Sequence, residues 1–110
     1  LPIFEKLMTR TEYNQFTDKL YSDMQQLLDA KNADYADAED PFINFKQSAD
    51  FGVDPLVGLF IRMGDKFQRL KAFSKHGQLQ VKGEGVDDSL RDLIGYCTLA
   101  LGMIEERKGG

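Results

Sequence analysis

The sequence has few of the residues that build disulfide frameworks, zinc sites or membrane-spanning helices. Its 110 residues include one cysteine, one histidine, three prolines and no tryptophan. A single cysteine excludes an internal disulfide and an all-cysteine zinc site. This residue, Cys97, lies in an apolar run and is expected to be a small buried side chain. No apolar run approaches the ~20 residues of a membrane span, and no signal-peptide pattern opens the chain. We therefore expect a cytoplasmic protein with no membrane partner.

The charges argue against one class of function and divide the chain into blocks. Eighteen acidic residues against 14 basic ones give a net charge of −4, which disfavours a protein whose main role is to hold a nucleic acid backbone. Residues 34–54 carry six acids and one base, whereas residues 62–82 carry six bases and one acid. Such blocks are typical of solvated faces that pair with one another. They also suit a ligand site in which a basic surface binds phosphate beside an acidic surface that binds a metal.

Apolar residues spaced by three and four predict one all-α domain over residues 1–110. Three long helices are expected over residues 9–31, 55–76 and 86–107. The connector between the first two, residues 32–53, is rich in aromatic residues and is expected to fold back as short helical turns. The predicted architecture is a helical bundle of three long helices plus these turns.

Start and stop signals support the helix boundaries. Thr9 or Thr11 suits the cap of the first helix, and Glu12 follows Thr9 at the capping-box spacing. Asp54-Pro55 is an N-cap residue followed by proline at the first helical position. The second helix is expected to end at about His76, with Gly77 as its stop.

The last helix predicts self-association. Its second half is apolar nearly all round, which is typical of a helix surrounded by protein. Four glycines also lie inside the two later helices, where each costs about 1 kcal/mol relative to alanine. Close helix-to-helix approach would compensate that cost within one subunit or between subunits. We therefore expect a homo-oligomer that completes the bundle.

Acidic residues of the later helices are candidate metal ligands. Glu84, Asp88 and Asp92 are spaced by four, so they form one stripe if the last helix begins early enough. Repulsion along such a stripe calls for positive charge nearby. A divalent cation such as Mg²⁺ would supply that charge. The alternative is an ion-pair network with Arg62, Lys66 and Arg69 of the preceding helix, in which Asp92 is partly buried.

Basic and aromatic residues form two candidate ligand-binding groups. Arg62, Lys66 and Arg69 share the face of the second helix opposite its apolar side, where they suit phosphate oxygens or remain a solvated face. The connector offers amide, carboxylate and ring groups that suit stacking and edge-bonding of a base. The alternative for this second group is aromatic capping of the bundle. Its members are Asn32, Asp34, Tyr35, Asn44 and Phe45.

Several short motifs together resemble a known family. They are, in chain order, Lys31-Asn32-Ala33-Asp34-Tyr35, Asn44-Phe45, Arg62-Met63-Gly64-Asp65-Lys66 with Arg69-Leu70, Glu84, and Asp88-Ser89-Leu90-Arg91-Asp92-Leu93 with Tyr96. In this order and spacing they resemble the phage family called nucleotide modification-associated domain. That family is similar to the all-α nucleoside triphosphate pyrophosphatases, the MazG-like and dimeric dUTPase group. The resemblance covers residues 20–105.

The resemblance implies a helical, usually oligomeric protein that acts on free nucleotides in phage metabolism. In the pyrophosphatases, acids of two adjacent helices hold magnesium and the link between the α and β phosphates is hydrolysed. Carried over here, Asp88, Asp92 and Glu84 would be the acids of the last helix, and Asp65 that of the helix before it. This chain departs from the pyrophosphatases in having Asp65 in place of a glutamate cluster. Its last-helix pair is also spaced by four rather than three.

Three functions therefore stand as alternatives. The first is a Mg²⁺-dependent nucleoside triphosphate pyrophosphohydrolase in which Asp65, Asp88 and Asp92 are catalytic and hold the metal. The second is a protein that sequesters a nucleotide, such as a host defence signal, without cleaving it. In that case the basic residues and the connector aromatics bind the nucleotide. The carboxylates then only hold the arginine and lysine side chains in place. The third is a structural helical oligomer with no small ligand.

Overall fold

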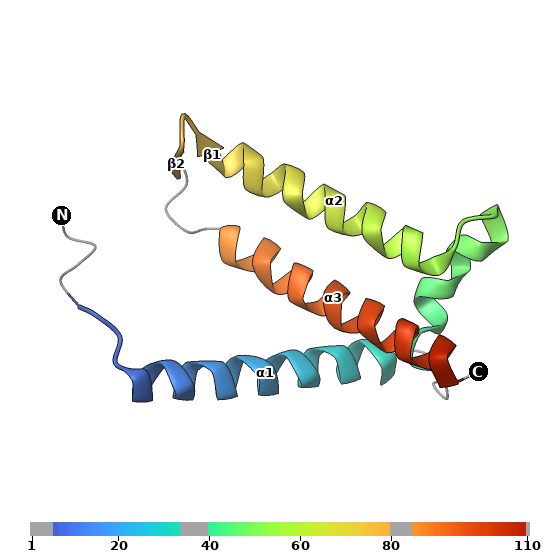
Figure 1. The fold of residues 1–110 in the computed structure, drawn as a ribbon, viewed down its shortest axis with the longest axis horizontal. Coiled ribbons are helices and arrows are strands. Elements are labelled where there is room, and N and C mark those ends of the chain that lie inside the picture. The colour runs from blue at the N-terminus through green and yellow to red at the C-terminus, as the bar shows by residue number, and fades with distance from the viewer. Residues whose placement is uncertain (1–5, 34–39, 80–84, 110) are drawn as a thin grey trace. The chain divides into compact units, whose positions relative to one another are not determined.

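The computed structural model describes residues 6–33, 40–79 and 85–109, and these residues form an all-α fold with one very short hairpin (Figure 1). The elements are helix α1 (Arg10–Ala33), the 3₁₀ helix η2 (Ile43–Phe51), helix α2 (Pro55–Phe73), strands β1 (Ser74–Lys75) and β2 (Gln78–Leu79), and helix α3 (Val86–Gly109). The predicted fold class and the three long helices are confirmed. The chain divides into two compact units, Leu1–Ala36 and Asp37–Gly110, and each is described by itself.

The first unit contains α1, which begins with the predicted capping box. The backbone N–H of Glu12 donates to Thr9 Oγ1 at 3.1 Å, and the backbone N–H of Thr9 donates to Glu12 Oε1 at 3.2 Å. These two bonds satisfy donors that a helix start leaves free. An ion pair of 2.8 Å between Lys19 and Asp23, one turn apart, adds support on the exposed surface. The helix continues two residues beyond the predicted end.

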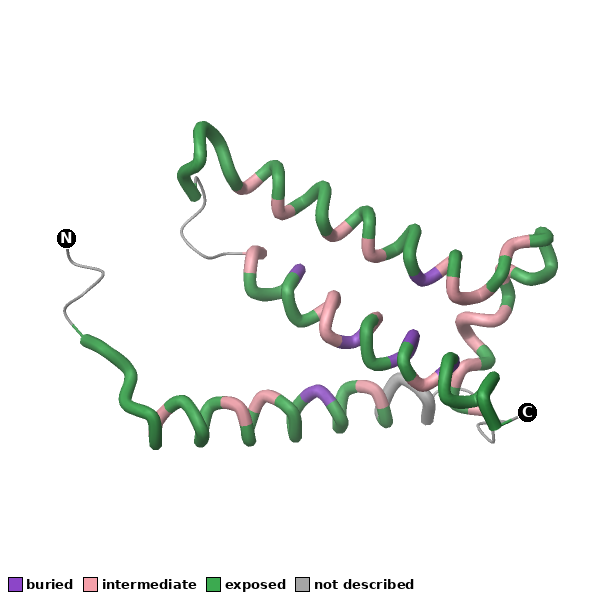
Figure 2. The backbone as a smooth tube through the Cα atoms, viewed as in Figure 1, coloured by how far each residue is buried: buried purple, intermediate pink, exposed green. Residues whose placement is uncertain are grey.

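The second unit is built on α2 and α3, which lie side by side and run antiparallel (Figure 1). Asp54 caps α2 as predicted, because its Oδ1 accepts a hydrogen bond of 2.9 Å from the backbone N–H of Leu56. The core lies where the two helices face each other (Figure 2). There Leu59 of α2 is 1% exposed, and Leu99 and Met103 of α3 are also buried.

The predicted end of the second helix at His76 is wrong, because α2 ends at Phe73 and a β-hairpin follows. Ser74 pairs with Leu79 and Lys75 with Gln78 in antiparallel register. The two residues between the strands, His76 and Gly77, have φ angles of 55° and 75°. Positive φ at both central positions belongs to type I′ turns, whose twist matches that of the flanking strands. His76 is thus a turn residue and not a helix cap.

The connector contains helical structure as predicted, in the form of η2, which packs against α2 and reaches α3 through the side chain of Lys46. The ring of Phe42, which precedes η2, lies against Gly102 of α3. A Cβ atom at position 102 would lie 2.7 Å from Phe42 Cζ, so this contact requires glycine. Gly58 of α2 has a similar role, since a Cβ there would lie 3.0 Å from Ser48 Oγ. Two of the glycines predicted to allow close approach thus face the connector.

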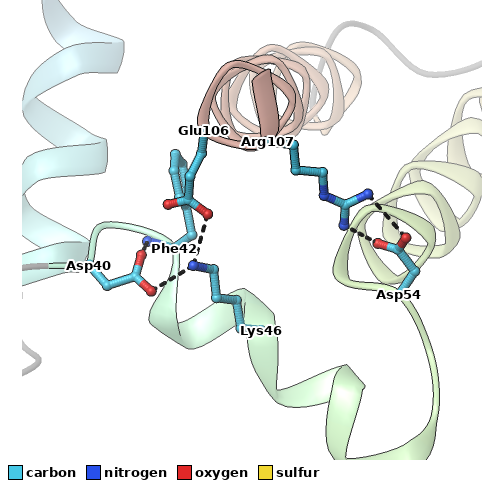
Figure 3. Close-up of polar contacts among 6 residues, drawn as sticks. All are labelled: Asp40, Phe42, Lys46, Asp54, Glu106 and Arg107. Atoms are coloured by element: carbon cyan, nitrogen blue, oxygen red, sulfur yellow. Dashed lines mark hydrogen bonds and ion pairs between the residues drawn. The ribbon is translucent and has the colours of Figure 1, made fainter. Parts of the chain in front are cut away.

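Two ion-pair groups fasten η2 and the start of α2 to the C-terminal end of α3 (Figure 3). Lys46 Nζ lies 2.8 Å from Asp40 Oδ2 and 3.0 Å from Glu106 Oε1. Arg107 makes a two-pronged contact with the Asp54 carboxylate, with 3.1 Å between Nη1 and Oδ2. We call these five residues the terminal clamp.

The terminal clamp changes the acidity of its members. The hydrogen bond from Lys46 lowers the pKa of Asp40, and the backbone N–H of Phe42 lowers it further. The guanidinium of Arg107 similarly lowers the pKa of Asp54, while the pKa of Arg107 is raised by the same bond. The pKa of Lys46 is raised by its hydrogen bonds to Asp40 and Glu106. Both aspartates are therefore held in their charged form.

The prediction that Cys97 is buried is wrong, because its side chain is exposed. The apolar run of α3 continues around the helix, but α2 covers only one side of it. Leu101 and Ile104 of the same run are also exposed. Among the helices that the structure describes, none is both long enough and apolar enough to cross a membrane.

Candidate functional site

An ion pair between α2 and α3 joins two of the predicted site residues. Lys66 Nζ lies 2.8 Å from Asp92 Oδ2. The side chain of Lys66 is 18% exposed and that of Asp92 is 39% exposed. The lysine stem thus covers apolar surface while its ammonium group meets the carboxylate at the rim of the helix contact. Asp92 is partly buried, as the sequence predicts.

Lys66 takes part in this contact because the packed face of α2 differs from the predicted one. Lys66 follows Leu59 by seven residues, so the two lie on the same side of the helix. The structure turns this side toward α3, which leaves Phe60 and Phe67 about half exposed. The expectation that Lys66 belongs to the face opposite the apolar side is therefore corrected. Phe60 and Phe67, which their spacing puts on the apolar side of the helix, are therefore turned toward the surface.

A second contact joins Arg62 of α2 to Phe45 of η2. The guanidinium carbon of Arg62 lies 5.1 Å from the ring centroid of Phe45, within the range of a cation–π interaction. Such a contact is worth about 0.5–1 kcal/mol at an exposed site. It also holds the planar guanidinium against a flat ring, so part of its conformational freedom is lost before any ligand arrives.

Arg62 and Lys66 are one helical turn apart, which brings the two contacts into one row. The row runs from Phe45 through Arg62 and Lys66 to Asp92, across η2, α2 and α3. We call these four residues the cation row. All four are predicted site residues, drawn from three separate sequence motifs. The row places two cations, a ring and a carboxylate on one side of the second unit.

The other predicted site residues lie outside the cation row. Asp65 and Arg69 are exposed on α2, and Asp88 is exposed near the start of α3. Asn44, which precedes Phe45 in η2, is half-buried. Asn32 lies in the last turn of α1, in the other unit, and its side chain is not among those described. Asp34, Tyr35 and Glu84 lie outside the described residues.

The described acids do not form a closed metal site. Within residues 6–33, 40–79 and 85–109, no three His, Cys, Asp or Glu side chains lie close enough together to hold a metal ion. The carboxylate of Asp92 contacts Lys66, and Asp65 and Asp88 are exposed. Because α3 begins at Val86, the described helix carries two members of the predicted acidic stripe, Asp88 and Asp92. As described, this donor set does not fit a preformed Mg²⁺ site.

The terminal clamp is a polar group that the sequence analysis missed. One signal for it exists, because Lys46 is the only base within the acidic block of residues 34–54. A lone cation among acids is the natural centre of an ion-pair group, and Lys46 also lies 5.9 Å from the ring centroid of Phe42. Its partner Glu106 is 60 residues away, and no local spacing predicts that contact.

Comparison with known proteins gives no assignment: no family model, no curated protein and no solved structure matches the chain.

Proposed function

We propose that the protein binds a free nucleotide, with the phosphates at the cation row. One observation carries the proposal: the ion pair of 2.8 Å between Lys66 and Asp92. It brings a predicted phosphate-binding residue and a predicted metal ligand to one place between two helices. Arg62 lies one turn away and is backed by the Phe45 ring. A basic strip and an acidic stripe that meet in this way suit a ligand with negative charge.

Each cation of the row has a distinct part in this proposal. The guanidinium of Arg62 presents a planar fork of N–H donors that matches phosphate oxygens in pairs. The ammonium of Lys66 is a compact charge, and Asp92 fixes its position. Arg69 follows Lys66 by three residues on α2 and extends the positive surface for a further phosphate. Asn44, which precedes Phe45 in η2, would contact the base or sugar.

The first form of the proposal is a Mg²⁺-dependent nucleoside triphosphate pyrophosphohydrolase of the kind that the motifs resemble. Asp92 would be the central metal ligand, and Asp88, Asp65 and Glu84 the further acids. Mg²⁺ held by these acids would supply positive charge at the phosphates and activation of water as the nucleophile. The protein's own contribution is charge neutralisation by Arg62 and Lys66 at the phosphates.

The second form is a protein that sequesters a nucleotide without cleaving it. It is favoured by the contact between Asp92 and Lys66, since this carboxylate serves as a positioning group for a cation. In this form the binding is independent of metal, and the ligand is released unchanged when the protein unfolds. Both forms include self-association of the chain, as expected from the apolar last helix.

Isothermal titration with nucleoside triphosphates, with and without Mg²⁺, tests the shared part of the proposal. Lys66→Gln and Arg62→Gln should each weaken binding about tenfold or more, because each removes a charge-assisted hydrogen bond to phosphate. Lys71→Gln is the matched control, since Lys71 is an exposed base on the same helix outside the cation row. Equal affinities in all three variants would overturn the assignment of the site.

A requirement for Mg²⁺ separates the two forms. Binding that needs the metal, followed by release of pyrophosphate, supports the hydrolase. Tight binding in the presence of a chelator, with intact ligand recovered after denaturation, supports sequestration. A nucleotide bound by the native state raises its apparent stability. The absence of any thermal shift across the common nucleotides would support the third alternative, a structural oligomer.

A further inference from the structure

Three carboxylates accompany the three cations at the proposed phosphate site. Asp88 and Asp92 lie one turn apart on the same side of α3, and Asp65 lies among the cations of α2. Asp87 and Arg91 pair with each other at 3.1 Å and add no net charge. The site therefore has a net charge of zero, with three positive and three negative groups: Arg62, Lys66, Arg69, Asp65, Asp88 and Asp92.

The ion pair between Lys66 and Asp92 leaves two arginines as the uncompensated cations of the site. Lys66 Nζ lies 2.8 Å from Asp92 Oδ2, so its charge is balanced before a ligand arrives. Arg62 and Arg69 are exposed, and neither makes an ion pair with another described residue. They are seven residues apart, which places them about two turns apart on one side of α2. Two positive charges are thus available to phosphate.

Asp65 lies between these two arginines on α2. It follows Arg62 by three residues and precedes Arg69 by four, and side chains at both spacings are neighbours on a helix surface, with about 5–6 Å between their Cβ atoms. The side chain of Asp65 is exposed, so it meets the solvent from which a ligand arrives. An anion bound by either arginine would lie within the ~10 Å over which charges interact in 0.1 M salt. The carboxylate of Asp65 therefore repels such an anion.

This repulsion grows with the charge of the ligand, because the Coulomb energy between two charges is proportional to their product. A phosphate monoester carries a charge of about −1.5 to −2 at neutral pH, and a free triphosphate carries roughly twice as much. A cyclic phosphate diester keeps a single ionised oxygen. The two arginines balance the charge of a monoester or a diester. The excess charge of a free triphosphate is not balanced, and it faces Asp65.

We propose that Asp65 makes the cation row selective for nucleotides whose phosphates carry about one or two net negative charges. This inference rests on the proposed function, because it requires phosphate binding at the cation row. Two kinds of nucleotide carry such a charge: a cyclic or simple monophosphate, and a triphosphate whose charge is reduced by Mg²⁺ bound in solution. In this role Asp65 discriminates between ligands by repulsion and does not hold a metal ion. Among the described residues it belongs to no group of three possible metal ligands.

Titration calorimetry of the full chain in 0.1 M salt measures this selectivity. The ligands are the cyclic monophosphate, the monophosphate and the triphosphate of each common nucleoside, all with a chelator, and the triphosphate again with Mg²⁺. The wild type should bind the monophosphate at least as tightly as the free triphosphate, and Mg²⁺ should tighten triphosphate binding about tenfold. Asp65→Asn should strengthen binding of the free triphosphate about tenfold but that of the cyclic monophosphate only about twofold, because the repulsion removed is proportional to the ligand charge.

Glu105→Gln is the matched control, since it removes the same charge from an exposed position on α3. Glu105 follows Asp92 by 13 residues, which is roughly 20 Å along the helix axis, so salt screens its effect on the cation row. This variant should leave all the affinities unchanged.

The results that contradict the selectivity differ from those that contradict nucleotide binding. Weaker binding of the Mg²⁺-loaded triphosphate in Asp65→Asn would overturn the proposal, because Asp65 would then be a metal ligand. A wild type that binds the free triphosphate most tightly would also overturn it, while nucleotide binding at the cation row would stand. If none of these nucleotides bound to the wild type, the proposed function would fail and the selectivity with it.

Discussion

Asp92 is the residue whose substitution separates the two forms of the proposed function. Its carboxylate holds Lys66 at 2.8 Å, and the same carboxylate is the central proposed ligand for Mg²⁺. A carboxylate next to an ammonium group either positions that cation or exchanges it for a metal when substrate arrives. The two roles have opposite consequences when the charge is removed and the shape is kept.

Asp92→Asn should abolish turnover, by about 100-fold or more, if the protein is a hydrolase, because the metal loses its central ligand. The protein should stay folded, since the asparagine fits the same space and the site is partly exposed. If the protein sequesters its ligand, the variant should bind phosphate as well as the wild type or better, because Lys66 is released. Phosphate release and titration calorimetry measure the two outcomes, and full turnover in the variant would remove Asp92 from the site.

The terminal clamp predicts a loss of stability in acid. Asp40 and Asp54 have lowered pKa values in the folded state, so the unfolded state binds more protons in the acid range. Their contribution is complete above the ordinary aspartate pKa of 3.8 and disappears as the pH falls through the lowered values. Urea unfolding followed by circular dichroism should show this loss below about pH 4.

Asp54→Asn provides the control for the acid effect. This variant keeps the cap of α2, because its amide oxygen can still accept from Leu56, but it loses the charge that pairs with Arg107. Its stability should therefore be lower than that of the wild type at neutral pH, with a smaller further loss in acid. If the free energy of unfolding changed with pH in the same way in the variant and the wild type, Asp54 would not contribute to the loss of stability in acid.

At the scale of elements, η2 holds its place through the contact between Phe42 and Gly102. Gly102→Ala adds a methyl group 2.7 Å from the Phe42 ring, so the ring or the helix must move. The free energy of unfolding should fall by about 1–3 kcal/mol, although alanine is the better helix former. Phe42→Leu in the Gly102→Ala background should recover part of this loss, which chemical denaturation measures. If the double variant lost as much stability as the two single variants Gly102→Ala and Phe42→Leu together, the result would contradict the contact.

Local signals in the sequence predict where the helices begin but not how they face one another. The capping box at Thr9 and the Asp54-Pro55 start are confirmed, because both depend on residues within one turn. The end of α2 is missed, since the I′ turn depends on His76 adopting a positive φ, which is uncommon for residues other than glycine. The helical spacing of apolar residues continues up to the turn, so it does not predict where the helix ends.

The candidate site shows the same limit. The grouping of Arg62 and Lys66 as a positive surface follows from their spacing, and so does the approach of Asp92 to the helix contact. The spacing does not predict which side of α2 faces α3, because the apolar residues of α2 cover more than one side of the helix. Packing with α3 selects the side that carries Leu59, which brings Lys66 inward and leaves Phe67 outside. Sequence periodicity defines an apolar arc, and tertiary contacts choose the part that is buried.

At the scale of the whole molecule, the cation row and the terminal clamp are two separate groups of the second unit. This separation predicts that variants of the two groups act independently. Asp54→Asn should lower the free energy of unfolding and leave nucleotide affinity within about threefold. Titration calorimetry and urea unfolding of this variant measure the two effects, and a large loss of affinity would show that the two groups are coupled.

The most direct test of the central claim is phosphorus NMR of the purified protein with a pool of nucleoside triphosphates and Mg²⁺. The account predicts that one nucleotide responds selectively, and that the response is lost in Lys66→Gln. Conversion to monophosphate and pyrophosphate would identify the hydrolase, and broadening of unchanged signals would identify sequestration. Signals of all nucleotides that stay sharp and unchanged, for wild type and variant alike, would contradict nucleotide binding at the cation row.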